Sequence, residues 1–304
     1  MRRNSSDGEL YSEVVDRDHE EYQYLDLMNT LIHYGEVKEN RTGIPTRSLF
    51  GNMMRFSLTD LKTGKPTIPL LTTKKVFYRG IVEELLWFIS GSTDAKILDA
   101  KGVKIWNPNS ASRDGDCGPI YGFQMCHFGA EYVDCNTDYA GQGVNQIHAV
   151  IESLIKDPTS RRHIISNWNP GQLNQMCLAP CHILSHFNVS RPDGIGPGRL
   201  ECLIYQRSAD VPLGVPFNIA SYATLTHMIA QQTGLVAKSL VYMTGDTHIY
   251  ENQIEPAREQ LKRDPRPWPI LRLNAVKTID SYTWEDFILE KYNPHPAIHY
   301  EFAV

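Results

Sequence analysis

A pair of strand-forming segments in the middle of the chain constrains the fold more than any other feature. Residues 182–189 and 200–207 are rich in strand formers, and the intervening residues 191–198 form a long loop of prolines and glycines. We therefore expect the two segments to pair as strands. Because side chains of a strand repeat every two residues, Leu203, Tyr205 and Arg207 are expected on one face. A helix is expected next, over residues 217–232, ending at Gly234.

Helices and strands are mixed along the rest of the chain instead of alternating regularly. Hydrophobic spacing predicts helices at 18–34, at 80–89 and from about 144 to just before Pro158, and strand-like runs occupy 48–58, 163–166 and 239–243. This order favours the α+β class. Residues 107–119 predict a surface loop, and the polar residues 1–17 a mobile tail. The expected apolar face of the third helix consists of Val144, Ile147, Ile151, Leu154 and Ile155.

Composition excludes some classes of function. The 304 residues are 41% hydrophobic, which suffices for a large core, and the net charge of −5 argues against a general nucleic-acid binder. Any anion site must then be a local cluster of arginines. The six cysteines include no C-x-x-C pair, so we expect reduced thiols in a cytoplasmic protein. Because there is neither a run of eighteen apolar residues nor a hydrophobic signal core, we expect no contact with membranes.

Cys181 is the candidate nucleophile, since it lies between Pro180 and His182. A thiolate adds readily to an electron-poor carbon when a nearby cation lowers the pKa of the thiol. The alternative is a buried structural cysteine at the start of a strand. A papain-like enzyme lacks support because the expected glycine-tryptophan pattern is missing, and the spacing of Cys177, Cys181 and His182 matches no common zinc site.

Arginines near this cysteine indicate an anionic ligand. Arg207 shares a short polar run with Ser208 and Asp210, and guanidinium groups suit phosphate. Arg41 and the pair Arg161–Arg162 could complete a phosphate site and lower the pKa of the cysteine. Taken alone, an adjacent arginine pair is an ordinary solvated surface feature.

Asn218 and the pair Glu83–Glu84 each have more than one interpretation. Asn218, at the expected start of a helix, suits a helix cap, but its amide can also pair with a carbonyl and an adjacent ring N–H, as in uracil. Glu83 and Glu84 are surrounded by apolar residues, and the simplest interpretation is that one or the other carboxylate is solvated.

These residues occur within a longer series of motifs that resembles thymidylate synthase from about Asp18 to Val304. The matching strings, in chain order, are 41–43 (RTG), 70–77 (LLTTKKVF), 83–88 (EELLWF), 104–106 (KIW), 118–124 (GPIYGFQ), 161–162 (RR), 180–182 (PCH), 205–208 (YQRS), 213–222 (LGVPFNIASY), 248–250 (HIY) and 292–296 (YNPHP).

The resemblance implies a fold, a reaction and an assembly. The fold would be a single catalytic domain over 18–304, with a large mixed sheet flanked by helices. Cys181 would add to carbon 6 of dUMP, and 5,10-methylenetetrahydrofolate would supply carbon and hydride, giving dTMP and dihydrofolate. A homodimer is implied, with the sheets packed at its interface and Arg161 and Arg162 donated to the other subunit's site.

The resemblance also assigns residues to roles. The catalytic set is Cys181, Glu84, Tyr121, Asp210, Arg207 and Asn218. The dUMP set is Arg41, Arg161, Arg162, Cys181, His182, Gln206, Arg207, Ser208, Asp210, Asn218, His248 and Tyr250. The folate set is Lys74, Phe77, Ile105, Trp106, Asn109, Asp210, Leu213, Gly214, Phe217, Ala303 and Val304, the last closing over the ligands as part of a C-terminal tail. No metal is implied.

A few positions depart from the family pattern: Met125-Cys126 replaces a usual Trp-Arg, Asn107 a common Asp, and the 191–198 loop is long. None removes an expected catalytic group. Two rival functions remain, a pyrimidine nucleotide hydroxymethylase on the same fold and a secondary RNA-binding regulator. An amide at Asn218 argues for dUMP over dCMP, for which an acid is expected there, and the net acidity argues against RNA.

Overall fold

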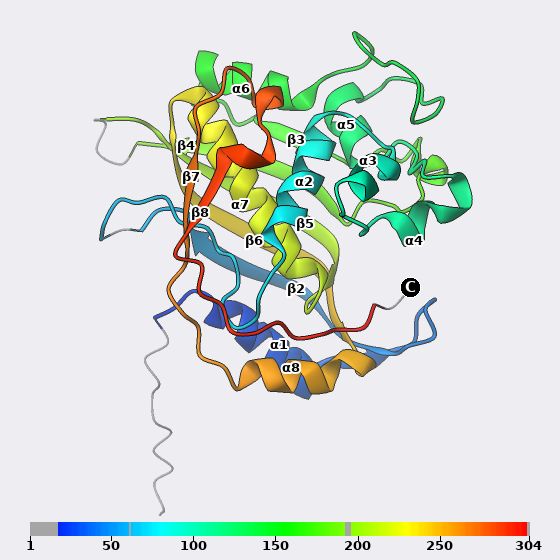
Figure 1. The fold of residues 1–304 in the computed structure, drawn as a ribbon, viewed down its shortest axis with the longest axis vertical. Helices are drawn as coiled ribbons and strands as arrows, with labels where there is room; N and C mark the ends of the chain where they lie inside the picture. The colour runs from blue at the N-terminus through cyan, green and yellow to red at the C-terminus, as the bar shows by residue number, and fades with distance from the viewer. Residues whose placement is uncertain (1–17, 61, 192–195, 303–304) are drawn as a thin grey trace, which may run out of the picture.

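A six-stranded mixed sheet organises the protein in a computed structural model that describes residues 18–60, 62–191 and 196–302 (Figure 1). The strands lie in the order β1-β2-β6-β5-β4-β3. Their bounds are β1 Glu36–Lys38, β2 Thr46–Ser57, β3 Ile164–Ser166, β4 His182–Ser190, β5 Arg199–Asp210 and β6 Val236–Tyr250. Only β5 and β6 pair in parallel, and the other neighbours are antiparallel. The predicted α+β class is confirmed, as is the pairing of the two central segments.

Helices cover one face of the sheet. Helix α7 (Gly214–Thr233) packs on β5 and β6, and α2 (Tyr78–Ile89) packs on α7 (Figure 1). The hairpin of β7 (Ile270–Leu273) and β8 (Phe287–Glu290) lies apart from the main sheet. The remaining helices are α1 (Tyr22–Tyr34), α3 (Ala95–Ala100), α4 (Asn107–Ser110), α5 (Tyr121–His127), α6 (Gln146–Lys156) and α8 (Ile254–Leu261), with short 3-10 turns at 111–113, 173–175, 251–253, 279–281 and 284–286.

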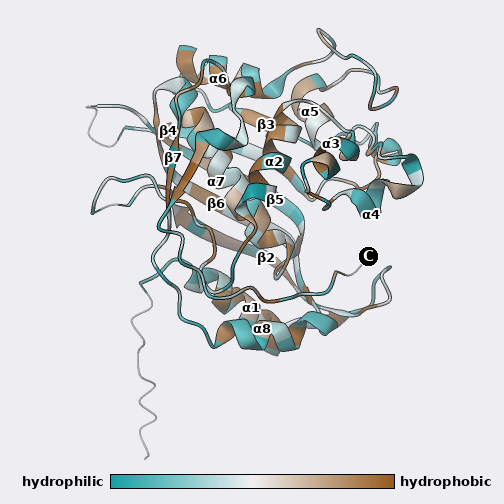
Figure 2. Cartoon of the chain, viewed as in Figure 1, coloured by the Kyte–Doolittle hydropathy of each residue, from teal (hydrophilic) through white to brown (hydrophobic). Residues whose placement is uncertain are grey.

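The core lies between the sheet and α7. Cys202 and Ile204 of β5 are fully buried on that side, and α7 is buried around most of its circumference, as expected for a central helix. Figure 2 shows hydrophobic residues along the strands and along α2. Leu203, Tyr205 and Arg207 alternate with the buried residues of β5 and are half-buried, so they share the opposite face as predicted.

That opposite face of the sheet is incompletely covered. Met53 of β2 and Ile164 of β3, which align with Tyr205 and Leu203 of β5, are 58% and 39% exposed. Among the described residues, no helix is long and apolar enough to cross a bilayer.

Four local expectations from the sequence need correction. Residues 107–119 are not simply a surface loop, because Pro108 sits in the first turn of α4 and Cys117 is fully buried. Of the face expected on α6, Val144 and Ile155 are exposed, since Val144 precedes the helix and Ile155 turns away from the core.

The third and fourth corrections concern element ends. The strand expected at 239–243 extends from Val236 to Tyr250, because β6 has neighbours on both edges. Helix α7 begins at Gly214, three residues earlier than expected, with Pro216 in its first turn. Asn218 is therefore inside the helix, and its interpretation as a helix cap is wrong. The expected tail at 1–17 lies outside the described residues.

Candidate active site

The loop that carries Cys181 is held by the arginine on the neighbouring strand. Arg207 Nε donates to the Pro180 carbonyl at 2.7 Å, and Nη2 donates to the Ala179 carbonyl at 2.9 Å. The Arg207 backbone N–H also donates to the Cys181 carbonyl at 2.8 Å. The guanidinium lies 5.7 Å from the centre of the Trp168 ring. Arg207 thus fixes the backbone on both sides of the cysteine and brings its charge beside the sulfur.

The sequence led us to expect a lowered pKa for the Cys181 thiol, and the structure indicates the opposite direction. Burial raises the pKa of the thiol, while the nearby charges of Arg207 and Arg41 lower it. The net direction is upward, because Cys181 lies largely out of solvent. Two guanidinium groups of this chain therefore offset only part of the cost of desolvating a thiolate.

Tyr121 and His182 flank the cysteine. The Tyr121 hydroxyl accepts a hydrogen bond of 2.7 Å from the Cys181 N–H. The ring of His182 stacks on that of Tyr121, with centroids 4.1 Å apart, and its Nδ1 contacts the Tyr222 hydroxyl at 2.8 Å. Burial lowers the pKa of His182 to about 3, so this imidazole is neutral at physiological pH.

The Asn218 amide is oriented by a hydrogen-bonded chain. Asn218 Nδ2 donates to Gln206 Oε1 at 2.8 Å, and the Tyr242 hydroxyl donates to the same oxygen. Gln206 Nε2 donates to the Ser208 carbonyl at 2.8 Å. These contacts fix which end of the Asn218 amide carries the oxygen, and among the described residues they leave that oxygen for a ligand.

Glu84 is a buried carboxyl close to the same cluster. The Trp106 indole N–H donates to Glu84 Oε1 at 2.7 Å, and the Trp106 ring meets Tyr121 edge-on at 6.0 Å between centroids. Burial raises the pKa of Glu84 to about 7, against the opposing effect of that hydrogen bond. Glu83 is 5% exposed and pairs with Lys101 at 2.6 Å. Glu83 is therefore not the solvated member of the pair, and Glu84 as a whole is half-buried.

Asp210 marks the other end of the site. Its carboxylate accepts from the Leu213 N–H at 3.2 Å and from Gln253 Nε2 at 3.3 Å, and burial raises its pKa. Lys74 is buried beside it, where Nζ donates to the Pro212 carbonyl and lies 4.4 Å from the centre of the Tyr300 ring. Burial lowers the pKa of Lys74 to about 8, and the nearby Asp210 opposes that effect.

Most of the chain matches known proteins. The family model described as thymidylate synthase matches residues 22–304. The chain is 48% identical to the thymidylate synthase of Agaricus bisporus, over 94% of this chain and 100% of that protein. It is 49% identical to the thymidylate synthase of Saccharomyces cerevisiae, over 94% and 97% of the respective chains.

The chain belongs to the thymidylate synthase family. The family, the fold and the thymidylate synthase activity expected from the sequence are confirmed. A bifunctional dihydrofolate reductase-thymidylate synthase of Paramecium tetraurelia is 47% identical over 95% of this chain, but the chain spans only 63% of that longer protein.

Several predicted thymidylate synthase site residues lie around this centre without direct bonds to it. His248 Nδ1 contacts Asp246 at 2.8 Å, and the His248 ring meets Tyr250 edge-on at 5.4 Å. Arg41 is exposed between β1 and β2, yet its charge acts on Cys181 and Tyr250. The predicted folate residues Ile105 and Asn109 are half-buried beside Trp106, Leu213, Gly214 and Phe217 are half-buried at the start of α7, and Phe77 is 50% exposed before α2.

Two of the predicted site residues, the adjacent arginines, are not brought to the cysteine within this chain. Arg161 and Arg162 are exposed beside β3, at the edge strand of the sheet. Ala303 and Val304 lie outside the described residues.

A buried residue that contacts the predicted site, Gln253, was missed by sequence reasoning. Gln253 is fully buried, and its Nε2 lies 3.3 Å from both Asp210 Oδ2 and the Glu301 carbonyl oxygen. Gln253 Oε1 accepts from the Tyr250 N–H at 3.1 Å. Its position three residues after Tyr250 was the only available signal, and a glutamine at a helix start gives little indication of such a role.

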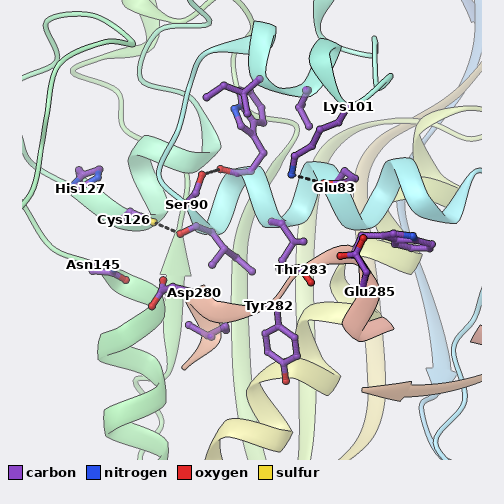
Figure 3. Close-up of a pocket in the computed structure, with 17 residues that line it drawn as sticks. Glu83, Ser90, Lys101, Cys126, His127, Asn145, Asp280, Tyr282, Thr283 and Glu285 are labelled. Carbon is purple, nitrogen blue, oxygen red and sulfur yellow. Dashed lines mark hydrogen bonds and ion pairs between the residues drawn. The ribbon is translucent and has the colours of Figure 1, made fainter. Parts of the chain in front are cut away.

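A cavity of about 720 Å³ lies elsewhere, against α2 (Figure 3). It is lined by residues including Glu83, Ser90, Cys126 and Asp280. Figure 3 shows Lys101 directed at Glu83 in its wall. Neither Cys181 nor Asn218 lines this cavity, so it is separate from the centre described above.

Proposed function

We propose that Cys181 is the nucleophile that adds to carbon 6 of dUMP, with 5,10-methylenetetrahydrofolate as the donor of carbon and hydride. The products are dTMP and dihydrofolate. The observation that carries the proposal is the fixed loop of Cys181, held by Arg207 on one side and by the Tyr121 hydroxyl on the other. A nucleophile fixed in this way can be aligned with a bound ring before reaction.

The proposed binding of dUMP uses, first, hydrogen-bonding groups of the site that are not already bonded within the described part of the protein. A guanidinium has five N–H donors, and among the described residues Arg207 side-chain donors bond only two carbonyls. The others are available for the dUMP phosphate, together with Ser208 and Arg41. The Asn218 amide oxygen accepts from the uracil N3–H, and an N–H of the same amide donates to the O4 carbonyl. His248 and Tyr250 bind the deoxyribose hydroxyl.

Proton transfer is assigned to the buried groups on the other side of the ring. Tyr121 lies next to the nucleophile and takes part in removing the carbon 5 proton. Glu84, whose pKa is about 7, can exchange a proton near neutrality through water. The folate occupies the side bounded by Trp106, Leu213 and Phe217, with its pterin ring on Asp210, and the C-terminal tail closes over both ligands.

Homodimer formation explains the features left without a role in one chain. The sheet face with Met53 and Ile164 offers apolar area to a second copy. Arg161 and Arg162 are exposed near this sheet's edge and reach the phosphate site of the other subunit. Their charges would further favour the Cys181 thiolate, which the arginines of one chain favour only in part.

Turnover and covalent trapping test the proposal together. Incubation with dUMP and the folate donor should produce dTMP and the absorbance of dihydrofolate in equal amounts. Formation of a hydroxymethyl nucleotide without dihydrofolate would instead support the hydroxymethylase. Mass spectrometry after treatment with 5-fluoro-dUMP and the folate should locate the adduct on Cys181, and an adduct on another cysteine would contradict the assignment.

Subunit sharing has its own experiment. A Cys181→Ala chain and an Arg162→Ala chain are each expected to be nearly inactive. After subunit exchange, the mixed dimer contains one site with both residues intact, so part of the activity should return. Absence of recovery after exchange has been verified by mass would contradict the shared site.

A further inference from the structure

Two cysteines that have no role in the proposed reaction, Cys117 and Cys177, lie against each other. The Cys177 N–H donates to the Cys117 carbonyl at 2.9 Å, and the two thiols are close enough that each shifts the pKa of the other. Gly118 adopts a left-handed φ of +73°, and a Cβ there would lie 2.1 Å from the Gln175 carbonyl oxygen. The backbones of the two segments are therefore in close contact at these cysteines.

This thiol pair is joined to the catalytic residues by two short segments. Tyr121 follows Cys117 by four residues, and Cys181 follows Cys177 by four residues. The far ends of the segments are linked by the hydrogen bond from the Cys181 N–H to the Tyr121 hydroxyl. The near ends are linked at the two cysteines. A change in the position of the thiol pair therefore also moves Cys181, because the connecting segments are short.

We propose that Cys117 and Cys177 are a reversible redox modification site, whose disulfide lowers the turnover of the enzyme by displacing the Cys181 loop. Disulfides bridge Cα atoms roughly 4.4–6.8 Å apart. The backbone hydrogen bond from Cys177 to Cys117 holds the two main chains side by side, which places the two thiols for a disulfide.

The two sulfur atoms have different roles. Cys177 is half-buried, whereas Cys117 is fully buried, so an oxidant reaches Cys177 first. The neighbouring Cys117 thiol lowers the pKa of Cys177 against the effect of burial, and the charge of Arg113 adds to that lowering. Cys177 is therefore the thiolate that reacts, and Cys117 the resolving thiol.

Hydrogen peroxide is the oxidant in the balanced reaction. The Cys177 thiolate attacks one peroxide oxygen, the O–O bond breaks, and the leaving hydroxide is protonated to water. The resulting sulfenic acid is attacked by the Cys117 sulfur, so that the S–S bond forms, the S–O bond breaks and a second water leaves. Overall, two thiols are oxidised and one peroxide is reduced to two waters. A dithiol reverses the reaction by exchange.

The expected effect on catalysis follows from geometry. An S–S bond is about 2.05 Å long, much shorter than the separation of two thiols in contact. Forming it draws the segments together and moves Cys181 relative to Tyr121. Because a misplacement of about 1 Å in an active site can cost roughly 100-fold in rate, we expect kcat to fall by about tenfold or more. The disulfide is independent of the proposed reaction, but this effect on turnover rests on it.

Peptide mapping tests the disulfide without any assay of activity. The full-length protein, saturated with dUMP to shield Cys181, is treated with hydrogen peroxide, and free thiols are alkylated before non-reducing digestion. We expect a linked peptide pair containing Cys117 and Cys177, which dithiothreitol separates. The proposal would be overturned by recovery of both cysteines as alkylated thiols. It would also be overturned by further oxidation of Cys177 to sulfinic acid, or by a disulfide to Cys135 or Cys181.

Matched variants test its effect on turnover. Cys177→Ser and Cys117→Ser should retain the activity of the reduced enzyme and keep it after peroxide. Wild-type protein and Cys135→Ser, which removes another half-buried thiol, should lose activity and regain it with dithiothreitol. A mapped disulfide with unchanged kcat would overturn the regulatory effect. If the reduced wild-type protein makes no dTMP, the proposed function fails, while the mapping still decides whether the disulfide forms.

Discussion

The hydroxyl oxygen of Tyr121 accepts the backbone N–H of Cys181 at 2.7 Å, so the two residues are linked through the main chain of the nucleophile. The side chain of Cys181 remains free of that bond. Tyr121 is also in contact with the neutral ring of His182 and with Trp106, the donor to Glu84. This tyrosine therefore connects the position of the sulfur to the buried acid.

Replacement of Tyr121 by phenylalanine should slow the reaction more than it weakens binding. Tyr121→Phe leaves the Cys181 N–H without its acceptor and removes the hydroxyl from the proton path, so we expect kcat to fall by about 100-fold. The KM for dUMP should change by less than about threefold. Steady-state kinetics measures both. Tyr132→Phe is the control, because its hydroxyl bonds Asp116 and Thr93. Equal losses in both variants would argue against a specific role.

Glu84→Gln should change the pH dependence of stability. Burial raises the pKa of Glu84 from 4.5 to about 7, so between these values the folded protein holds a proton that the unfolded chain has lost. The free energy of unfolding therefore falls as pH rises through this range, by up to about 3 kcal/mol for this group. The glutamine variant lacks this loss. Urea denaturation at pH 5 and pH 8 measures the difference, and parallel pH profiles for the two proteins would contradict it.

Gln253→Leu should weaken the folate site selectively. Leucine is of similar size but removes the amide that lies between Asp210 and the Glu301 carbonyl, and a lost hydrogen bond to a charged group costs roughly 1.5–3 kcal/mol. We expect KM for the folate to rise about tenfold, with the Kd for dUMP within about twofold. Asn252→Ala removes only a surface contact to the Glu301 carboxylate and is the control. A similar rise in Asn252→Ala, or no rise in Gln253→Leu, would contradict this role.

Asn218→Asp should change which pyrimidine is accepted. A carboxylate has no donor for Gln206 Oε1 or for the uracil O4 carbonyl, but it can accept from the amino group of cytosine. We expect kcat/KM for dUMP to fall by about 100-fold or more, while turnover of dCMP becomes detectable. Initial rates with both nucleotides measure this. Asn218→Ala should lose dUMP activity without gaining dCMP activity, and the same gain in the alanine variant would exclude the carboxylate as its cause.

The chain order of hydrophobic and polar residues was sufficient for the main elements. Local periodicity predicted the paired segments at β4 and β5 and the long helix α7. It also predicted the alternation at Leu203, Tyr205 and Arg207. The motif strings identified the family because many of them occur in one order along the chain. The sequence pattern was less informative about where an element begins and ends when paired strands decide this. The length of β6, for example, is set by the strands on both of its edges.

Sequence alone therefore determined which residues carry chemistry, since a thiol, a guanidinium or an amide is present whatever the fold. Only the tertiary structure decided the environment of each: Arg207 bonding the carbonyls before Cys181, Glu84 buried against Trp106, and Cys117 beside Cys177. The physical reason is that desolvation and hydrogen bonding depend on contacts between residues distant in the chain. Burial could therefore raise the pKa of Cys181 even though the sequence supplied arginines to lower it.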